Sequence, residues 1–326
     1  FLGGDQFWSV LLSARLGYLH MTYAEWIARW PFWNDRILAM SEEIIYKLPK
    51  RIHNRCSVIG DLTADLNETA KIDDPLPQGK WIALIPGSKS AKLKIGIPFF
   101  LDVADKISTL MPNCNFLIPL APTTNIDEIK YFGSSKNPIT KQYSSRIKSI
   151  KKANDQETRG ILTTKNSTII FIQEKHPAYN DLSQCDLALT TIGANTSELG
   201  SLNTPMIVVV PTQHILVMEA WDGFLGLVAR LPILKWFLGR LISFIKMRKR
   251  GLMAWPNISA KRMIVPERVG HITPRQIAEE AVDWLNSPAR LLGQKKDLQA
   301  LRGNKGATNK FCQQIIDLLE EKNLLD

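Results

Sequence analysis

The residues best suited to chemistry lie in three short segments, and the first is Pro86-Gly87-Ser88-Lys89. It follows an apolar run and precedes an amphipathic stretch, so a strand and then a helix are expected on its two sides. A glycine at such a junction allows close approach of the backbone to a ligand, and a helix N-terminus presents unpaired N–H groups to an anion. Ser88 and Lys89 add a hydroxyl and a cation. Strand–Gly–Ser turns are common, so this segment indicates a phosphate site only in combination with others.

The second segment covers residues 191–198, Thr-Ile-Gly-Ala-Asn-Thr-Ser-Glu. It too joins an apolar run to a helical stretch, and Glu198 falls in the first turns of that helix. A carboxylate has two acceptor oxygens, which suit the two hydroxyls of a ribose. A glutamate at this position is equally typical of a capping residue that complements the helix dipole. The residues alone leave both roles open.

The third segment, residues 255–267, is expected to be a loop that carries an amide, Asn257, and two adjacent cations, Lys261 and Arg262. By itself it is compatible with any surface loop. In an open α/β sheet, ligands bind outside the carboxyl ends of the strands, where successive strand–loop–helix turns converge. The first two segments occupy such ends, and the third can close the site. Together the three predict a site for the diphosphate and ribose of a nucleotide sugar.

Short apolar runs alternate with amphipathic helical stretches along the chain, and this pattern is typical of a parallel sheet with crossover helices. The expected fold class is therefore α/β. Strands are expected at residues 36–40, 57–59, 81–85, 116–119, 168–173, 187–190 and 206–210. Helices are expected at residues 6–16, 179–184, 196–202 and 213–229, over 99–110, from Thr273 onward and around 311–319.

A chain of 326 residues is long for one hydrophobic core, which favours two domains. We expect a first domain over residues 1–70, a linker over 71–79, a second, Rossmann-like domain over 80–288 and C-terminal helices over 289–326. The second domain contains all three segments and is therefore the expected nucleotide-sugar-binding domain. The chain begins on Phe-Leu-Gly-Gly, without an initiator methionine or a signal-peptide pattern. We interpret the first domain as incomplete.

The composition, 45% hydrophobic and 22% charged, is that of a globular protein. Lysine and arginine exceed aspartate and glutamate by 41 − 31 = 10, which indicates an anionic partner: a nucleic acid, an acidic membrane surface or a phosphorylated substrate. No nucleic-acid-reading module appears, so nucleic acid is not an expected partner. The five histidines and four cysteines show no metal-ligand or disulfide spacing. We expect no metal, no cofactor and a reducing, cytoplasmic compartment.

Two basic stretches differ in character. Residues 130–165 are polar with few apolar anchors, and we interpret them as a solvated insertion. Residues 232–250 mix cations with Trp, Phe, Leu and Ile, and charge interrupts them too often for a bilayer span. They suit a helix lying on an anionic membrane surface; a helix buried between domains or subunits is the alternative. The residues expected to contact the membrane are Lys235, Trp236, Arg240, Lys246 and Arg250.

The three segments, in this order, resemble the lipid-A-disaccharide synthase family of GT-B glycosyltransferases, and the resemblance covers most of the chain. It is carried in the second domain by Pro86-Gly87-Ser88-Lys89, Gly193-Ala194-Asn195-Thr196-Ser197-Glu198, and Pro256-Asn257-Ile258-Ser259-Ala260-Lys261-Arg262 with Val265-Pro266-Glu267. In the first domain it is carried by Gly4-Asp5-Gln6-Phe7, Tyr23-Ala24-Glu25-Trp26 with Trp30, and Gly60-Asp61-Leu62-Thr63-Ala64-Asp65.

The chain departs from the family pattern at three places. Lys89 stands where the family usually has arginine, which loses bidentate phosphate geometry. Ile192-Gly193-Ala194 replaces Ser-Gly-Thr, which removes two hydroxyls, and Asp61 replaces a histidine. The nucleotide-sugar interpretation stands, while the sugar and the acceptor are left open.

The resemblance implies a GT-B fold of two facing Rossmann-like domains, with the first on the acceptor side. It implies a UDP-sugar donor, a lipid-linked or glycolipid acceptor and inversion at the anomeric carbon. A lipid acceptor, together with residues 232–250, favours a protein peripheral on the inner face of a membrane. By the resemblance Asp5 would be the general base, Glu198 would hold the ribose, and Asn257 and Arg262 would reach the diphosphate. The full expected nucleotide-sugar-binding set is Gly87, Ser88, Lys89, Gly193, Asn195, Thr196, Glu198, Asn257 and Arg262.

Two other functions stay open. A UDP-sugar 2-epimerase shares the GT-B fold and the ribose-binding glutamate, but it needs further acid/base carboxylates and histidines, and this chain has five histidines in all. A nucleotide-sugar-binding or membrane-associated remnant without catalysis is the third function. A homodimer is left open as a partner, and the residues do not decide the oligomeric state.

Overall fold

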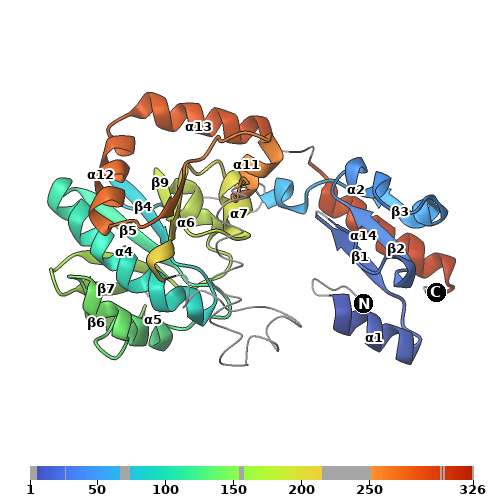
Figure 1. The fold of residues 1–326 in the computed structure, drawn as a ribbon, viewed down its shortest axis with the longest axis horizontal. Coiled ribbons are helices and arrows are strands. Elements are labelled where there is room, and N and C mark those ends of the chain that lie inside the picture. The colour runs from blue at the N-terminus through green and yellow to red at the C-terminus, as the bar shows by residue number, and fades with distance from the viewer. Residues whose placement is uncertain are drawn as a thin grey trace. The chain divides into compact units, whose positions relative to one another are not determined.

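The computed structural model describes residues 6–25, 27–66, 74–153, 158–214, 251–301, 303 and 305–324. The chain forms two compact units, Phe1–Thr69 with Arg302–Asp326, and Ala70–Leu301 (Figure 1). The candidate base Asp5 and the basic stretch at residues 232–250 lie outside the described residues, as does most of the helix expected at 213–229. The roles expected for Asp5, Lys235, Trp236, Arg240, Lys246 and Arg250 therefore stay predictions.

The larger unit is built on an eight-stranded sheet in the order β11-β10-β9-β4-β5-β8-β7-β6. Its strands are β4 (Lys80–Ile85), β5 (Cys114–Pro119), β6 (Ile147–Lys151), β7 (Gly160–Thr164), β8 (Ile169–Gln173), β9 (Leu187–Thr190), β10 (Met206–Pro211) and β11 (Glu267–Gly270). Neighbouring strands are parallel from β11 through β8, and β7 runs antiparallel to both β6 and β8. Strand β4 lies between β5 and β9, so the chain fills the sheet first on one side of β4 and then on the other. The point between β4 and β9 is therefore the topological switch point of the sheet.

Helices cover both faces of this sheet (Figure 1). They are α4 (Ser90–Leu110), α5 (Ile126–Phe132), α6 (Tyr179–Gln184), α7 (Asn195–Ser201), α11 (Trp255–Ala260), α12 (Pro274–Leu285) and α13 (Pro288–Leu301). Helices α4, α5 and α12 share one apolar core with one face of the sheet. Helices α6 and α7 contribute to a second core on the other face. The larger unit is therefore a doubly wound α/β domain, as the alternating pattern predicted.

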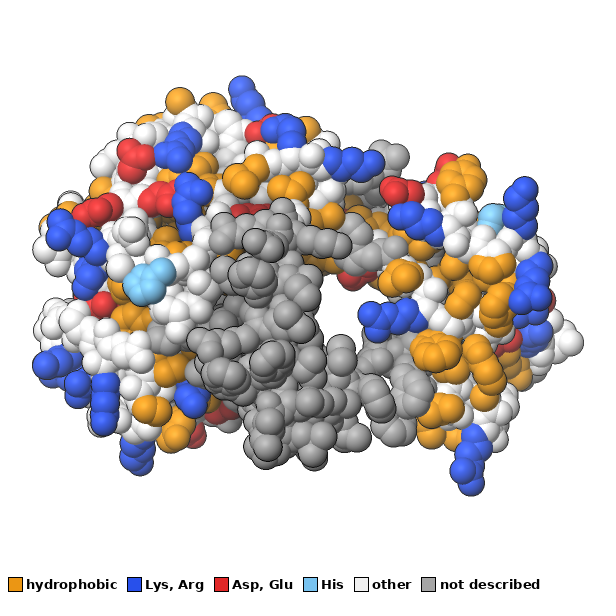
Figure 2. All heavy atoms as spheres, viewed as in Figure 1, with side chains coloured by type: hydrophobic (Ala, Val, Ile, Leu, Met, Phe, Trp, Pro, Cys, Tyr) orange, Lys and Arg blue, Asp and Glu red, His pale blue; other side chains and the backbone are white. Residues whose placement is uncertain are grey.

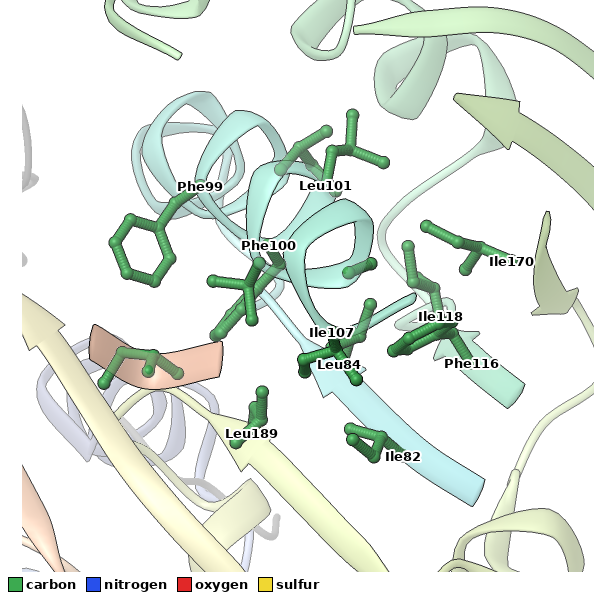
Figure 3. Packing of buried hydrophobic residues seen from close by; sticks show 14 of the residues in the cluster. Ile82, Leu84, Phe99, Phe100, Leu101, Ile107, Phe116, Ile118, Ile170 and Leu189 are labelled. Atoms are coloured by element: carbon green, nitrogen blue, oxygen red, sulfur yellow. The ribbon is translucent and has the colours of Figure 1, made fainter. Parts of the chain in front are cut away.

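Strand β4 shows how the sequence produces these two cores. Successive side chains of a strand point to opposite faces, and Ile82 and Leu84 enter the α4 core, whereas Ala83 and Ile85 enter the other. Because both faces are covered, the strand is apolar at consecutive positions. Figure 3 shows Phe100 and Ile107 of α4 in the first core near Leu84. Each such fully buried side chain contributes roughly 1.5–3 kcal/mol to folding.

The interpretation of residues 130–165 as a solvated insertion is wrong. The stretch contains β6 and β7, which extend the sheet at its edge, and Leu162 and Thr164 are fully buried. Arg159 lies in the cluster that we expected to be exposed, yet its guanidinium pairs with the buried carboxylate of Asp181 at 2.7 Å. The alternation of Gly160 to Thr164 between buried and half-buried side chains is that of a short edge strand, and the many flanking lysines conceal it.

The smaller unit has a three-stranded parallel sheet in the order β1-β2-β3. Its elements are α1 (Gln6–Leu16), β1 (Met21–Ala24), β2 (Arg36–Ala39), α2 (Glu42–Tyr46), β3 (Cys56–Val58) and α14 (Ala307–Glu321). Leu318 of α14 packs against Met21, Leu38 and Ile59. The Asp65 carboxylate accepts hydrogen bonds from the backbone N–H of Gly306 at 2.7 Å and of Thr308 at 2.8 Å. The expected C-terminal segment 289–326 is thus divided, because α13 belongs to the larger unit and α14 to the smaller.

Charge and hydropathy add two observations about the described surface. On the face shown in Figure 2, Lys and Arg side chains are distributed over both units and are not gathered into one stripe. Among the described residues, no helix combines the length and the hydropathy that a membrane crossing requires.

Candidate functional site

The candidate site lies at the switch point of the larger sheet. Ile85 at the end of β4 is paired in register with Thr190 at the end of β9. The turns that follow these two strands therefore lie side by side, at the edge where open α/β sheets bind ligands. They border a cavity of about 770 Å³ that also receives the loops after β5 and β8. The cavity is lined by Ile85, Gly87, Ser88, Lys89, Lys92, Pro119, Leu120, Ala121, Pro122, Thr123, His176, Pro177, Ala178, Tyr179, Leu182, Gly193, Ala194, Asn195, Glu198 and Leu199.

Both turns require glycine. Gly87 has φ +104°, and a Cβ there would lie 2.8 Å from Cδ of Lys92. Gly193 has φ +154°, and a Cβ there would lie 2.7 Å from Oδ1 of Asn195. L-residues with side chains rarely adopt such angles. The two glycines therefore let the turns close tightly and leave bare backbone at the cavity wall.

Helix α4 begins at this wall. Its N-cap is Lys89, whose side chain makes no capping hydrogen bond. Ser88 and Lys89 are both exposed beside the cavity. A helix of 21 residues carries a partial positive charge at its N-terminus, which favours an anion there. The first segment is thus placed as the sequence predicted, with its hydroxyl and cation at the cavity.

Glu198 is half-buried in the cavity wall, and burial raises the pKa of its carboxyl above the ordinary value. Tyr179 lines the same cavity, and its pKa is raised first by burial and then by the negative charge of Glu198. A capping box is not formed in α7, since the N-cap is Ala194, which makes no side-chain capping bond. Glu198 lies in the first turn of α7 and also lines the cavity, so both roles stay open on the geometry.

Asn195 and Thr196 hold the second turn in shape. The Asn195 amide nitrogen donates to the Thr190 hydroxyl and, at 2.9 Å, to the carbonyl of Thr191. The buried Thr196 hydroxyl donates to the carbonyl of Gly193 at 2.9 Å and accepts from the Trp255 N–H at 3.1 Å. Asn195 borders the cavity, whereas Thr196 lies behind it.

The structure does not bring Asn257 and Arg262 to the cavity. The Asn257 side chain is fully buried, and its oxygen accepts from the backbone N–H groups of Ile264 at 2.7 Å and Val265 at 2.9 Å. Its nitrogen donates to the Val265 carbonyl at 2.8 Å and to Oε1 of Glu267 at 2.7 Å. These four bonds use the whole hydrogen-bonding capacity of an amide. Arg262 is exposed and paired with Asp297 at 2.8 Å. The expected diphosphate contacts of this segment are therefore corrected: Asn257 organises its own loop.

Sequence reasoning missed four polar residues of the cavity: Lys92, Thr123, His176 and Tyr179. Lys92 was predictable in part, since its position three residues after Lys89 places both side chains on neighbouring helical positions. Its ammonium donates to the Ile192 carbonyl at 2.6 Å. Burial, and then the nearby charge of Lys89, lowers the pKa of Lys92.

The site therefore combines two cations beside glycine turns with a carboxylate, a phenol and an imidazole. Anionic groups of a ligand match the cations and the helix N-terminus, and hydroxyl groups match the carboxylate. Within the ranges that the structure describes, no group of three or more His, Cys, Asp or Glu side chains is placed to hold a metal ion.

Comparison with known proteins places this geometry among relatives. No family model matches the chain. It is 23% identical to a lipid-A-disaccharide synthase of Myxococcus xanthus over 244 residues. The matched region covers 73% of this chain and 49% of the relative. It is 25% identical over 245 residues to that of Gloeothece citriformis (74% and 50%), and 22% over 309 residues to that of Persephonella marina (91% and 65%). The similarity to lipid-A-disaccharide synthases expected from the motifs is thus confirmed. The chain spans about half the length of most of these relatives.

Solved structures give the fold. A putative UDP-N-acetylglucosamine 2-epimerase from Listeria monocytogenes matches with a TM-score of 0.51 at 10% identity, over 97% of this chain and 72% of that one. The UDP-GlcNAc 2-epimerase from Neisseria meningitidis, bound to UDP-GlcNAc, matches with a TM-score of 0.50 at 10% identity, over 95% and 72%. The predicted α/β fold of the GT-B type is therefore confirmed.

Proposed function

We propose that this chain binds a UDP-sugar in the cavity of its larger unit and belongs to an inverting glycosyltransferase with a lipid-linked or glycolipid acceptor. The observation that carries the proposal is the pairing, at one switch point, of two glycine turns and two lysines with a half-buried carboxylate. The similarity to lipid-A-disaccharide synthases supports the transferase class. The Neisseria structure supports the donor class, because a protein of the same fold binds UDP-GlcNAc.

The chemistry of the cavity assigns roles to the two ends of the nucleotide. The diphosphate takes the side of Gly87, where the cations and the N-terminus of α4 lie. The ribose takes the side of Glu198, whose ionised carboxylate accepts from both hydroxyls. Tyr179 borders the same cavity, and the negative charge of Glu198 adds to the effect of burial in raising the Tyr179 pKa.

The smaller unit offers a surface suited to an acyl-bearing acceptor. Trp30, Phe32 and Trp33 are exposed large aromatic residues, and the Arg51 guanidinium lies 4.2 Å above the Phe32 ring. Exposed aromatic groups of this kind commonly mark binding sites for apolar partners. A lipid acceptor and the basic stretch at residues 232–250 together support a protein peripheral on an anionic membrane.

Asp5 is proposed as the general base that takes the proton of the acceptor hydroxyl. A sugar hydroxyl is a poor nucleophile at neutral pH, and a positioned base contributes roughly 10²–10⁴-fold. The alternative role that the sequence gives Asp5 is the N-cap of the helix that begins at Gln6. Asn caps a helix as well as Asp does but accepts no proton. We expect Asp5→Asn to leave UDP binding intact and to lower turnover at least about 100-fold; unchanged turnover would assign Asp5 to the cap.

One observation favours a second function, a UDP-sugar 2-epimerase. His176 and Tyr179 border the cavity together with Glu198, and an epimerase needs acid/base groups beside the donor sugar. The two functions differ in product, since a transferase releases UDP and an epimerase returns an isomerised UDP-sugar.

The test is a panel of UDP-sugars incubated with the protein and a lipid extract. Release of UDP that depends on the extract supports the transferase, and isomerised donor without UDP release supports the epimerase. A thermal-shift series with UDP accompanies it, because a ligand that binds only the folded state raises its apparent stability. No shift at millimolar UDP would remove the nucleotide site from the proposal.

A further inference from the structure

We propose that Lys92 is the principal diphosphate-binding cation of this cavity. The inference deepens the proposed function and rests on it for the nucleotide, but it concerns the anion alone. It replaces the diphosphate contacts expected from Asn257 and Arg262, and it gives the exposed Lys89 a secondary part.

Lys92 is held between the two turns. Its stem passes so close to Gly87 that a Cβ there would lie 2.9 Å from Cβ and 2.8 Å from Cδ of the lysine. Its ammonium donates to the Ile192 carbonyl at 2.6 Å and lies 3.6 Å from the Cβ position of Gly193. The charge is therefore fixed at the junction of the strand-end turns, beside the cavity that Lys92 lines.

This charge has no acidic partner among the described residues: the contact of its ammonium is with the Ile192 carbonyl. An ammonium has three donors, and this contact uses one. A partly buried cation without a counter-charge is unfavourable in the free protein, and an anion that pairs with it removes this cost. Lys89 is exposed, so solvent screens its attraction for an anion more strongly.

A second unsatisfied group, the hydroxyl of Thr191, lies near the same turn. The residue is 8% exposed, and within the described part of the chain its hydroxyl has no hydrogen-bond partner. The hydroxyl lies 3.4 Å from the Cβ position of Gly87, and Thr191 and Lys92 border the same small recess. Buried hydroxyls are normally satisfied. The recess is lined mostly by apolar side chains and Thr191 does not line the ligand cavity, so this hydroxyl is not assigned to the diphosphate.

The alternative role for Lys92 is a strut that holds the Ile192 carbonyl and so the second turn. The two roles differ in what they affect. Loss of a strut disturbs the whole pocket and weakens uridine and UDP alike, whereas loss of a phosphate cation weakens only ligands that carry phosphate. Arginine restores the charge, and methionine keeps the length of the stem without it.

The experiment is isothermal titration of wild type, Lys92→Met and Lys92→Arg with UDP, uridine and inorganic pyrophosphate. Lys94→Met is the matched control, because Lys94 lies on the same helix but not among the lining residues. We expect Lys92→Met to weaken UDP and pyrophosphate at least about 10-fold, as for other hydrogen bonds to charged groups. Uridine affinity should change less than about twofold, which is the size of a surface effect. Lys92→Arg should recover most of the loss, and Lys94→Met should match wild type.

Equal losses for uridine and UDP in Lys92→Met would identify a strut and overturn the inference, as would an unchanged UDP affinity. Titration with pyrophosphate distinguishes a failure of the Lys92 inference from a failure of the proposed function. If wild type binds pyrophosphate through Lys92 but not UDP, the anion site stands and the nucleotide assignment falls. If wild type binds neither ligand, both are overturned.

Discussion

The turns after β4 and β9 differ from the loop around Asn257 in where their polar groups find partners. The sequence assigned residues of all three segments to one nucleotide-sugar site. In the turns, the Thr191 hydroxyl has no partner in the described chain, and the Lys92 charge has a carbonyl but no carboxylate. In the loop, every hydrogen-bonding site of Asn257 is taken by its own neighbours.

This difference teaches how to tell a binding residue from a structural one of the same type. A buried polar group that is fully satisfied stabilises the fold and has nothing left for a ligand. A polar group left partly satisfied at a cavity costs stability in the free protein, and a ligand can recover that cost. The two kinds of residue should therefore respond differently to substitution.

The largest effect is expected at Asn257. Asn257→Ala removes four buried hydrogen bonds, each contributing about 0.5–1.5 kcal/mol, so unfolding free energy should fall by about 3 kcal/mol or more. Urea unfolding measures this loss. Arg262→Ala is the comparison, because its ion pair is exposed and should contribute at most about 1 kcal/mol. If Asn257→Ala is stable but loses UDP binding selectively, Asn257 contacts the diphosphate after all, and the difference between the loop and the turns does not hold.

The next effect concerns the ribose. Glu198→Ala should lose most of the thermal shift that UDP produces, since a carboxylate that accepts two hydroxyls contributes about 10-fold or more in affinity. Glu174→Ala should keep the shift, because Glu174 follows β8 without lining the cavity. Differential scanning fluorimetry with and without UDP makes the comparison. Similar behaviour of the two variants would show that Glu198 does not hold the ligand.

The pH dependence of uridine binding sharpens the same assignment. Burial raises the folded-state pKa of Glu198, so the carboxyl takes up its proton at a higher pH than an exposed glutamate does. Uridine affinity should therefore fall as pH is lowered toward that pKa, while the ligand-free protein loses a stabilising contribution as pH rises through it. Glu198→Gln should flatten the affinity profile and raise the melting temperature of the free protein at neutral pH. A slope that survives in Glu198→Gln would show that Glu198 is not the group responsible.

The smallest effect is expected at Thr191. Thr191→Val keeps the shape and removes an unsatisfied buried hydroxyl, so the free protein should gain about 1 kcal/mol of stability. UDP affinity should change less than about twofold, because Thr191 does not line the ligand cavity. Chemical unfolding and titration on the same sample test both expectations. A variant that loses stability would show that the hydroxyl already has a partner in the free protein.

The sequence predicted the central part of the fold well because its signals are local. The ranges 6–16, 179–184 and 187–190 agree with α1, α6 and β9 residue for residue. Strands β1, β6, β7 and β11 were not predicted. The last three are at or near sheet edges, where side chains face solvent and the apolar pattern weakens.

The site was predictable only to the extent that it follows from strand ends. Gly87, Glu198 and their turns could be placed because strand–loop–helix order fixes their edge of the sheet. The contact of Lys92 with Ile192 joins residues a hundred positions apart, and local patterns carry no such information. Asn257 was misassigned for a different reason. Its partners lie within ten residues, but the residue type alone does not show whether an asparagine amide bonds to its own loop or is free to bind a ligand.

The place of α14 has a consequence for biosynthesis. The larger unit is inserted into the smaller one along the chain, since Ala70–Leu301 separates Phe1–Thr69 from Arg302–Asp326. A ribosome therefore completes all eight strands of the larger sheet before it makes Leu318, the residue that covers Met21, Leu38 and Ile59. Strands β1 to β3 are thus made before the larger unit and the helix that covers them is made after it, so their apolar face stays open to chaperones or to wrong partners until α14 leaves the exit tunnel.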